Sequence, residues 1–506
     1  MSGIAVDGAT AFPEAQVRAL APPPGPAVTL GQIEAARAAI LALYRDAGYA
    51  LTTVDAVLSR DGVLRFVVGE GHITEVKLDG DIGPAGVQVL RFLNRLTEVR
   101  PLDVATMERY LLLASDVPGV SLRSILRPSG TGPGALTLVA QVARKPFSGY
   151  VTGDNRAYRL TGRQQGLAAV QANAFTSFGE RSELAFFYAN GGTQIFGQAG
   201  TEFFVGSSGT RVRVYAGTGS SSPADPLRSI GYEGDTTVAG IAVTYPLIRR
   251  RQQTLLLSAA FDAIESEIDV DAAPGVQQTL SKDNLRVARL GGDWSVFDAF
   301  AGDDRPAVNA VSLRLSQGID GFGASSSGDP LLSRAGAQTD FTKIGFELSR
   351  TQTLFRPWAQ AVVSLLGVLA GQWTDDILPQ AEKFYVGGAR LGRGYYAGEI
   401  TGDKALAGTI ELQLSFPWEI AALQQSVRID PTLYAFYDAA RTWENVRGDP
   451  SRDVSSIGAG VRMSLTDYVE LQLEGVHRFE TRPNGAASIV DEEPRQAFYW
   501  RALMRF

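Results

Sequence analysis

Two residues of opposite charge, in segments of different character, could form a specific contact in this sequence. Arg393 lies in a glycine-rich segment, residues 387–396, which has the composition of a loop. Asp438 ends the segment Phe436-Tyr437-Asp438, which reads as part of a strand. An arginine and a carboxylate that meet in a partly dehydrated space form charge-assisted hydrogen bonds, on the order of 1.5 to 3 kcal/mol each. This pair can form only if something folds the glycine-rich loop inward.

No arrangement of residues in the sequence indicates catalysis. There is no Gly-x-Ser-x-Gly elbow, no His-Glu-x-x-His pair and no Walker-type phosphate loop. The two histidines, His72 and His477, lie in separate regions and outside any recognisable cluster. Asp269 and Asp271 lack the remaining ligand spacing of a calcium site, so we interpret them as part of a loop. We therefore expect no enzymatic activity, no cofactor and no bound metal.

The composition excludes several classes of protein. The 506 residues include 55 glycines and 9% aromatic residues, with no cysteine and a net charge of -7, which excludes disordered, collagen-like and disulfide-stapled chains. The pI near 5.2 argues against a nucleic-acid partner, because such binding needs a clustered basic surface. No window offers the roughly 18 apolar residues of a membrane-spanning helix. If the protein lies in a membrane, strands must span it.

The first part of the chain repeats one order of elements: strand, helix, helix, strand, strand. In the first copy these elements are expected near 3–6, 13–20, 31–47, 51–58 and 63–68, and in the second near 73–78, 84–96, from 103, 120–126 and 136–142. We expect residues 1–70 and 71–146 to form two small α+β domains. Their order of elements resembles that of the polypeptide-transport-associated (POTRA) domain, which often has a phrase like the one at residues 116–120 after its second helix.

From Phe147 onward, polar and apolar residues alternate every second position. A soluble sandwich would bury the apolar face of such strands, whereas an outer-membrane barrel turns that face to lipid. The sequence contains 16 candidate strands, whose connections alternate between short ones such as 177–180 and long ones such as 265–282 and 374–403. This alternation is typical of outer-membrane barrels. We therefore expect residues 147–506 to form a 16-stranded antiparallel transmembrane β-barrel.

The end of the chain fits the same interpretation. Apolar residues occupy every second position from 498 to 506, and the last two aromatic residues of this row are Trp500 and Phe506. Such an ending resembles the signal that the barrel-assembly machinery reads during biogenesis of outer-membrane proteins. An ordinary edge strand would leave this row exposed and prone to aggregation.

The whole chain resembles the outer-membrane transporters of two-partner secretion, the FhaC/ShlB/HecB type. In that family a long outer loop folds into the pore and carries an Arg-Gly-Tyr or Arg-Gly-Phe tip, matched here by Arg393, Gly394 and Tyr395. A following Gly-Asp is matched at 402–403, and an inner-wall Phe-x-Asp motif is matched by Phe436 and Asp438. The resemblance implies that loop 374–403 folds inward and that its tip meets the inner wall. A plug helix, which the family usually carries before its first POTRA domain, is not matched, because a strand already begins at Gly3.

The resemblance also implies a function. An unfolded partner protein, a large exported β-rich adhesin, haemolysin or toxin, would bind the POTRA domains in the periplasm and cross the barrel pore after the loop moves. Strand edges accept many sequences, so we expect the partner to add a strand at the second strand of each POTRA domain, with Leu51, Val54, Val120 and Leu122 at the contact. We expect a monomer in the lipid bilayer of a bacterial outer membrane. The alternatives are a barrel-assembly or insertase relative and a passive pore or receptor.

Overall fold

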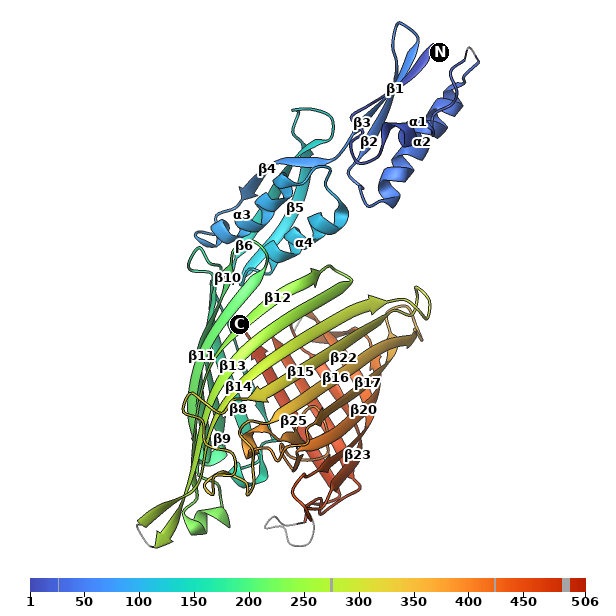
Figure 1. Cartoon of the computed structure of the whole chain (residues 1–506). Helices are drawn as coiled ribbons and strands as arrows, with labels where there is room; N and C mark the ends of the chain where they lie inside the picture. The colour runs from blue at the N-terminus through green and yellow to red at the C-terminus, as the bar shows by residue number, and fades with distance from the viewer. Residues whose placement is uncertain (26, 274–275, 423–424, 485–491) are drawn as a thin grey trace.

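The computed structural model describes residues 1–25, 27–273, 276–422, 425–484 and 492–506. Two small α+β units stand in line at one end of a large β-barrel, and the N-terminus lies at the far tip of the first unit (Figure 1). The C-terminus lies at the end of the barrel that carries the units (Figure 1). Among the described residues, no helix is long and apolar enough to cross a membrane.

The first unit is a three-stranded sheet covered by two helices. Its elements are β1 (Gly3–Asp7), α1 (Glu14–Arg18), α2 (Leu30–Asp46), β2 (Thr53–Leu58) and β3 (Val63–Gly69). The sheet order is β1-β3-β2, so β2 is an edge strand. Thr29 starts α2 with a capping box, and the helix buries Ile40 and Tyr44 against Phe66 of the sheet. These contacts form a separate core for this unit.

A buried carboxylate fastens the N-terminal segment to this core. Glu70 accepts hydrogen bonds from the backbone N–H groups of Thr10 (2.6 Å) and Ala11 (2.8 Å) and from the Tyr44 hydroxyl (2.8 Å). Burial alone would raise the pKa of Glu70, but these hydrogen bonds favour the charged form more strongly and hold its pKa below the usual value.

The second unit has the same order of elements, with a short additional helix. It contains β4 (His72–Asp79), α3 (Ala85–Leu93), η1 (Asn94–Glu98), α4 (Val104–Ser115), β5 (Val120–Pro128) and β6 (Ala135–Arg144), and the sheet order is β4-β6-β5. Asp103 caps α4 by accepting a hydrogen bond from the Thr106 N–H (2.8 Å). As in the first unit, the second strand of the copy, here β5, lies at a sheet edge.

The expectation for Leu51 was wrong. The strand that we expected from residue 51 begins only at Thr53, and Leu51 lies in a turn before β2. Its side chain packs against the core of the second unit, where Gly71 leaves room for it. Leu51 therefore joins the two units and is not part of an exposed strand edge.

The second unit is also bonded to the barrel. Arg249, at the end of a barrel strand, donates hydrogen bonds to both carboxylate oxygens of Asp116 (2.9 and 2.7 Å). The rings of Phe92 and Phe204 meet edge to face with centroids 5.2 Å apart. The unit is thus held against the barrel rim by polar and apolar contacts.

The prediction of a 16-stranded antiparallel barrel is confirmed. Over the described residues, sixteen long strands close into one sheet, and a short strand, β21 (Trp418–Ala422), pairs with the start of β22. The long strands are β7 (Phe147–Asp154), β8 (Gln165–Asn173), β9 (Arg181–Ala189), β10 (Gln194–Val205), β11 (Thr210–Ser221), β12 (Glu233–Arg249), β13 (Gln253–Ala273), β14 (Val276–Asp298), β15 (Ala307–Gly318), β16 (Thr342–Phe355), β17 (Val362–Trp373), β20 (Lys404–Ser415), β22 (Gln425–Trp443), β23 (Arg452–Ser464), β24 (Val469–Arg478) and β25 (Gln496–Arg505). Pairing of β25 with β7 closes the barrel.

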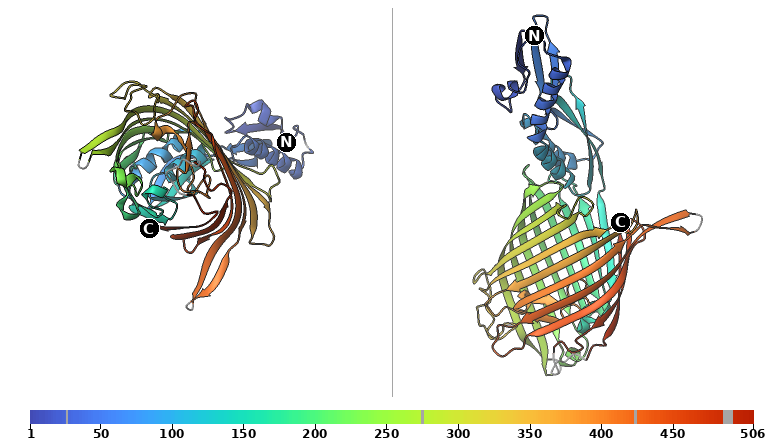
Figure 2. Two further views of the ribbon diagram at one scale, coloured as in Figure 1. Left: turned by 90° about the horizontal axis from the view of Figure 1, so that it is seen from below. Right: turned by 90° about the vertical axis from the view of Figure 1, so that its right-hand side faces the viewer.

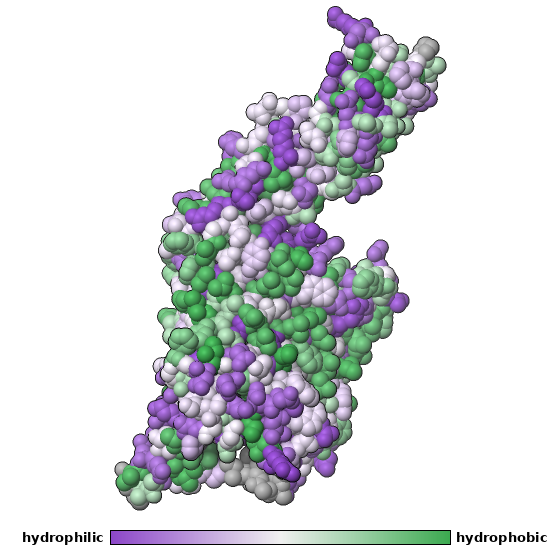
Figure 3. All heavy atoms as spheres, viewed as in Figure 1, coloured by the Kyte–Doolittle hydropathy of each residue, from purple (hydrophilic) through white to green (hydrophobic). Residues whose placement is uncertain are grey.

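Apolar side chains cover the outside of the barrel, as the alternation predicts. On β9, for example, Leu184, Phe186 and Tyr188 are exposed, while the residues between them face the interior. Figure 3 shows apolar residues gathered over the middle of the barrel wall, with more polar residues toward both ends. This is the surface that a lipid bilayer requires.

One connection differs from the expectation. Residues 265–282 were expected as a long loop, but residues 265–273 and 276–282 continue strands β13 and β14 past the rim opposite the α+β units (Figure 1). Asp269 and Asp271 are therefore strand residues and not loop residues. The acidic side chains made this segment look like a loop, because a strand beyond the membrane has no need for an apolar outer face.

Residues 374–403 connect β17 to β20 and fold into the barrel. We call them the lumenal loop; they contain η5 (Gln380–Glu382), β18 (Phe384–Val386) and β19 (Ile400–Gly402). Val386, Leu391 and Ile400 of this loop pack on small apolar residues of the inner wall. Figure 2 (left) looks along the barrel and shows this loop inside the ring of strands.

Candidate functional site

The wall opposite the loop tip comes from β22, whose side chains alternate across the barrel wall. Leu433 and Tyr437 are each 46% exposed on the outside. Tyr434, Phe436 and Asp438 have the opposite parity and are buried, with Asp438 fully inaccessible. Strand periodicity therefore places an aspartate and two aromatic rings on the inner wall.

The structure brings Arg393 and Asp438 together. The guanidinium donates from Nε to Oδ2 (3.1 Å) and from Nη2 to Oδ1 (3.0 Å), and the backbone N–H of Arg393 donates to Oδ2 as well (2.8 Å). The contact is bidentate and includes the backbone of the tip itself. The contact therefore holds the backbone of the loop tip in place and also pairs the charge of the Arg393 side chain.

Two further wall residues complete the surroundings of Arg393. Its Nη1 also donates to Glu411 of β20, and its guanidinium carbon lies 3.6 Å from the centre of the Phe436 ring. Glu411 in turn accepts two hydrogen bonds from Arg462 of β23 (2.7 and 2.9 Å). Two arginines and two carboxylates thus balance in charge; Arg393, Glu411 and Asp438 are buried, while the Arg462 side chain is 37% exposed.

Sequence reasoning did not single out Arg462, although a signal for it was present. On β23, Gly458 and Gly460 have the same parity as Arg462, and an added Cβ at each would lie about 2.5 Å from the Phe436 or Tyr434 ring. Glycines opposite aromatic residues on a neighbouring strand indicate rings that lie flat on the inner wall. The guanidinium of Arg462 lies over the Tyr434 ring at 3.9 Å.

The other two tip residues are held by the last strands of the barrel. The carbonyl of Gly394 accepts hydrogen bonds from the Tyr499 hydroxyl (2.9 Å) and from Arg478. A Cβ at position 394 would lie 2.5 Å from Cβ of Ser456, so only glycine allows this approach. The Tyr395 hydroxyl donates to the carbonyl of Ser455 (2.9 Å). All three tip residues therefore contact the inner wall.

A second charged group holds the descending part of the lumenal loop. Glu382 accepts hydrogen bonds from Arg289 of β14 (2.6 and 3.1 Å) and pairs with Lys343 of β16 (2.7 Å). The loop is therefore attached at separate points on two regions of the wall.

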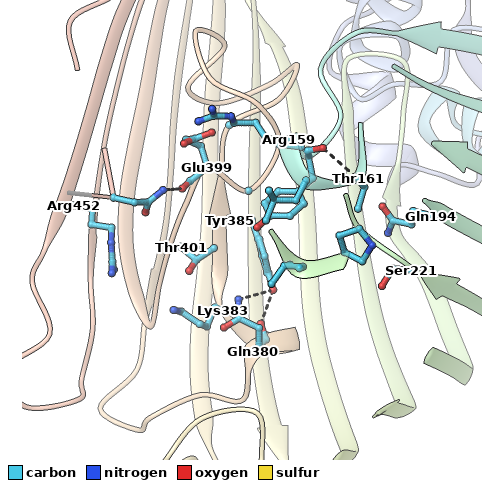
Figure 4. Close-up of a pocket in the computed structure, with 18 of the residues that line it drawn as sticks. Arg159, Thr161, Gln194, Ser221, Gln380, Lys383, Tyr385, Glu399, Thr401 and Arg452 are labelled. Carbon is cyan, nitrogen blue, oxygen red and sulfur yellow. Dashed lines mark hydrogen bonds between the residues drawn. The ribbon is translucent and has the colours of Figure 1, made fainter. Parts of the chain in front are cut away.

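A cavity of about 880 Å³ remains beside the loop. Figure 4 shows Tyr385, Glu399 and Thr401 of the loop on one side of it, and Gln194 and Ser221 of strands β10 and β11 on the other. Its lining is mostly polar, which suits a water-filled space. The docked loop thus narrows the interior without filling it.

The remaining predicted residues lie in two places. Val54 lies on the edge strand β2 with its side chain buried in the core, and Val120 and Leu122 are partly buried on the edge strand β5. Trp500 and Phe506 lie on the outer face of the last strand. Phe506 also exchanges two backbone hydrogen bonds with Gly149 (3.0 Å each), and its ring covers that glycine at the seam between β25 and β7.

Among the residues that the structure describes, no three histidine, cysteine or acidic side chains cluster as metal ligands. The groups that meet at the loop tip are hydrogen-bonded charged side chains and aromatic rings, which hold the tip in place on the inner wall. The arrangement suits a reversible attachment of a loop inside a channel.

Comparisons with known proteins agree with this architecture. A family model described as haemolysin secretion/activation protein ShlB/FhaC/HecB matches residues 135–463, and a POTRA domain model, ShlB-type, matches residues 1–71. The heme/hemopexin transporter protein HuxB of Haemophilus influenzae is 22% identical over 410 residues, which cover 80% of this chain and 69% of that protein.

Two solved structures share the fold. CdiB from Escherichia coli superposes with a TM-score of 0.75 at 18% identity, covering 100% of this chain and 90% of that one. CdiB from Acinetobacter baumannii gives a TM-score of 0.66 at 12% identity, covering 100% and 89%. At these identities the likeness is one of architecture.

Proposed function

The chain belongs to the haemolysin secretion/activation protein family ShlB/FhaC/HecB and is a two-partner secretion transporter of the outer membrane. We propose that its lumenal loop is the gate of the channel. In this proposal the contact of Arg393 with Asp438 and Glu411 is a latch that holds the gate on the inner wall. The observation that carries the proposal is the bidentate pair between Arg393 and Asp438, buried inside a closed barrel.

The N-terminal units supply the entrance. We propose that residues 1–70 and 71–146 are two POTRA domains in the periplasm, and that residues 147–506 are the membrane barrel. An unfolded partner would add a strand at the free edge of β2 or β5, because backbone hydrogen bonds at an edge tolerate many sequences. Val54 supports the edge from the core side, while Val120 and Leu122 lie on the edge itself.

The partner in this proposal is a large exported β-rich protein, such as an adhesin, a haemolysin or a toxin. The transporter acts as a monomer and performs translocation without covalent chemistry. Its own barrel is inserted by the barrel-assembly machinery, for which the aromatic end at Trp500 and Phe506 is the signal.

Secretion of the partner tests the latch. Arg393→Ala and Asp438→Ala are each expected to lower secretion of the exported partner protein, while the amount of folded barrel stays unchanged. Normal secretion in both variants would refute the latch. Conductance of the barrel without any dependent secreted protein would favour a passive pore instead.

A further inference from the structure

We infer that Arg334, on the loop between β15 and β16, is a positioning residue that closes the neck of the lumenal loop. We call residues 319–341 the outer loop, and Leu378 with Asp403 the neck. The lumenal loop can then leave the wall only after the outer loop releases it. This inference rests on the proposed function of the lumenal loop as a gate.

Asp403 closes the neck from within. Its side chain is fully buried and accepts hydrogen bonds from the backbone N–H groups of Leu378 (2.9 Å) and Asn445 (2.8 Å). Leu378 lies on the descending limb of the loop, Asp403 on the returning limb, and Asn445 just after β22. One carboxylate therefore joins both limbs to the barrel wall.

Arg334 closes the same neck from outside. Its Nη1 donates to Asp403 Oδ1 (2.6 Å) and to the carbonyl of Leu378 (2.7 Å). Its Nη2 donates to Asp403 Oδ2 (3.1 Å) and to Glu444 (2.7 Å). One guanidinium thus bonds both limbs of the loop and the wall, which requires the planar fork of an arginine.

The two loops share further bonds near this point. The backbone N–H of Gln380 donates to the Ser333 hydroxyl (2.9 Å), and that of Gln338 donates to the carbonyl of Ile377 (2.9 Å). Ser333 is itself bonded to Asp283 of β14 through its N–H (2.9 Å) and its hydroxyl (2.5 Å). The outer loop therefore links the wall at β14 to the neck of the lumenal loop.

Loss of Arg334 should loosen the neck while both carboxylates that it contacts keep other hydrogen-bond donors. Glu444 also accepts hydrogen bonds from Lys383 (2.7 Å) and Arg452 (3.3 Å). Asp403 keeps its two backbone donors. The cluster without Arg334 then holds two carboxylates and two cations, so Arg334→Gln is expected to assemble as a barrel.

A single cysteine can report departure of the loop tip, because the natural chain has none. Ser456 is fully buried under Gly394, and Ser456→Cys adds a thiol at this covered position with little change in size. The test measures the rate at which a water-soluble maleimide labels this thiol in the full-length barrel, in detergent, with heat-modifiable migration as the check of folding. Arg393→Ala in the same background shows the rate when the latch is broken.

Arg334→Gln is expected to raise the labelling rate on the order of tenfold or more, since it removes hydrogen bonds to a charged group. Arg334→Lys keeps the charge but loses the planar, forked guanidinium, so its labelling rate should lie between that of Arg334→Gln and that of the chain with Arg334. The matched control is Arg286→Gln, because Arg286 holds the outer loop at the carbonyl of Phe322 (3.0 Å) and pairs with Glu265 (2.9 Å). This control should leave the rate unchanged.

Labelling of Arg334→Gln at the natural rate, while Arg393→Ala is labelled faster, would overturn the role of Arg334 and leave the latch standing. An equal increase in Arg286→Gln would also overturn it, because any loosening of the outer loop would then suffice. Labelling of Arg393→Ala at the natural rate would overturn the latch itself. If Arg334→Gln does not assemble, Arg334→Lys and Asp403→Asn carry the test, and natural rates in both would overturn the inference.

Discussion

Removal of the Arg393 side chain should shift the lumenal loop from its docked to its released position by about a hundredfold. The side chain gives Asp438 two hydrogen bonds and Glu411 a third, and it stacks on Phe436. Removing one partner of a buried ion pair costs roughly 3 to 5 kcal/mol, and we take about 3 kcal/mol because the lumen is partly hydrated. Each 1.4 kcal/mol is a factor of about ten in an equilibrium.

Asp438→Asn should have a smaller effect. The amide oxygen still accepts one hydrogen bond, and Arg393 keeps its pair with Glu411. We expect a loss of about 1.5 kcal/mol, or roughly tenfold in the docking equilibrium. In the double variant Arg393→Ala/Asp438→Asn the second change should add little, because its partner is already gone.

Conductance in planar lipid bilayers measures this equilibrium, as the fraction of time that a single barrel spends in its high-conductance state. The matched control is Arg211→Ala, which removes a different arginine, paired with Glu202 at 3.3 Å on the barrel wall. That variant should conduct like the natural protein. Full additivity of Arg393→Ala and Asp438→Asn would refute the coupling that the structure shows, and an equal effect of Arg211→Ala would refute its specificity.

Three further predictions concern single positions. Gly394→Ala should raise the high-conductance fraction, because its Cβ would meet Ser456, and Ser456→Gly in the same chain should restore the natural fraction; no rescue would contradict the steric cause. Phe506→Ala should lower the amount of heat-modifiable barrel in the membrane far more than Phe498→Ala, because the Phe506 ring covers Gly149 at the closing seam; equal losses would contradict this. Because the pKa of Glu70 is lowered by folding, its contribution to stability is present above its unfolded pKa of about 4.3 and is lost as pH falls through the lower folded value. The protection factors of the N-terminal segment in hydrogen exchange, corrected for the intrinsic rate at each pH, should therefore fall on acidification toward pH 3, and Glu70→Gln should show low protection at neutral pH too; a pH-independent difference between the two proteins would contradict this.

The barrel could be predicted from the sequence because the membrane imposes one rule on every strand. The side chains of β22 must alternate between lipid and lumen. Because Leu433 and Tyr437 face lipid, Phe436 and Asp438 face the lumen. Two-residue periodicity carries this information without knowledge of the neighbours. Outside the membrane a strand needs no apolar face, so two-residue alternation does not reveal it. The extension of β13 and β14 beyond the rim therefore has the sequence pattern of a loop.

The contacts around the lumenal loop could not be predicted in the same way. Arg334, Arg289 and Lys343 lie far from the loop in the sequence and have no periodic relation to it. Their partners depend on how long connections cross the barrel mouth, and loop conformation follows from tertiary contacts rather than from local pattern. The composition of its segment singled out Arg393, but the docking of this residue on the inner wall was implied only by the resemblance to a family motif.

The chemistry of the attachment explains how one loop can be both firmly docked and releasable. The loop buries the apolar side chains of Val386, Leu391 and Ile400 against small side chains such as Ala407 and Ala440, and these contacts stabilise the docked position. Most of the specificity comes from buried charges, which are stable only when paired with correct geometry. In a dry core, separation of such pairs would be prohibitive. In a barrel whose lumen already holds a polar cavity of about 880 Å³, the separated charges regain water, so their separation costs less free energy than it would in a dry core.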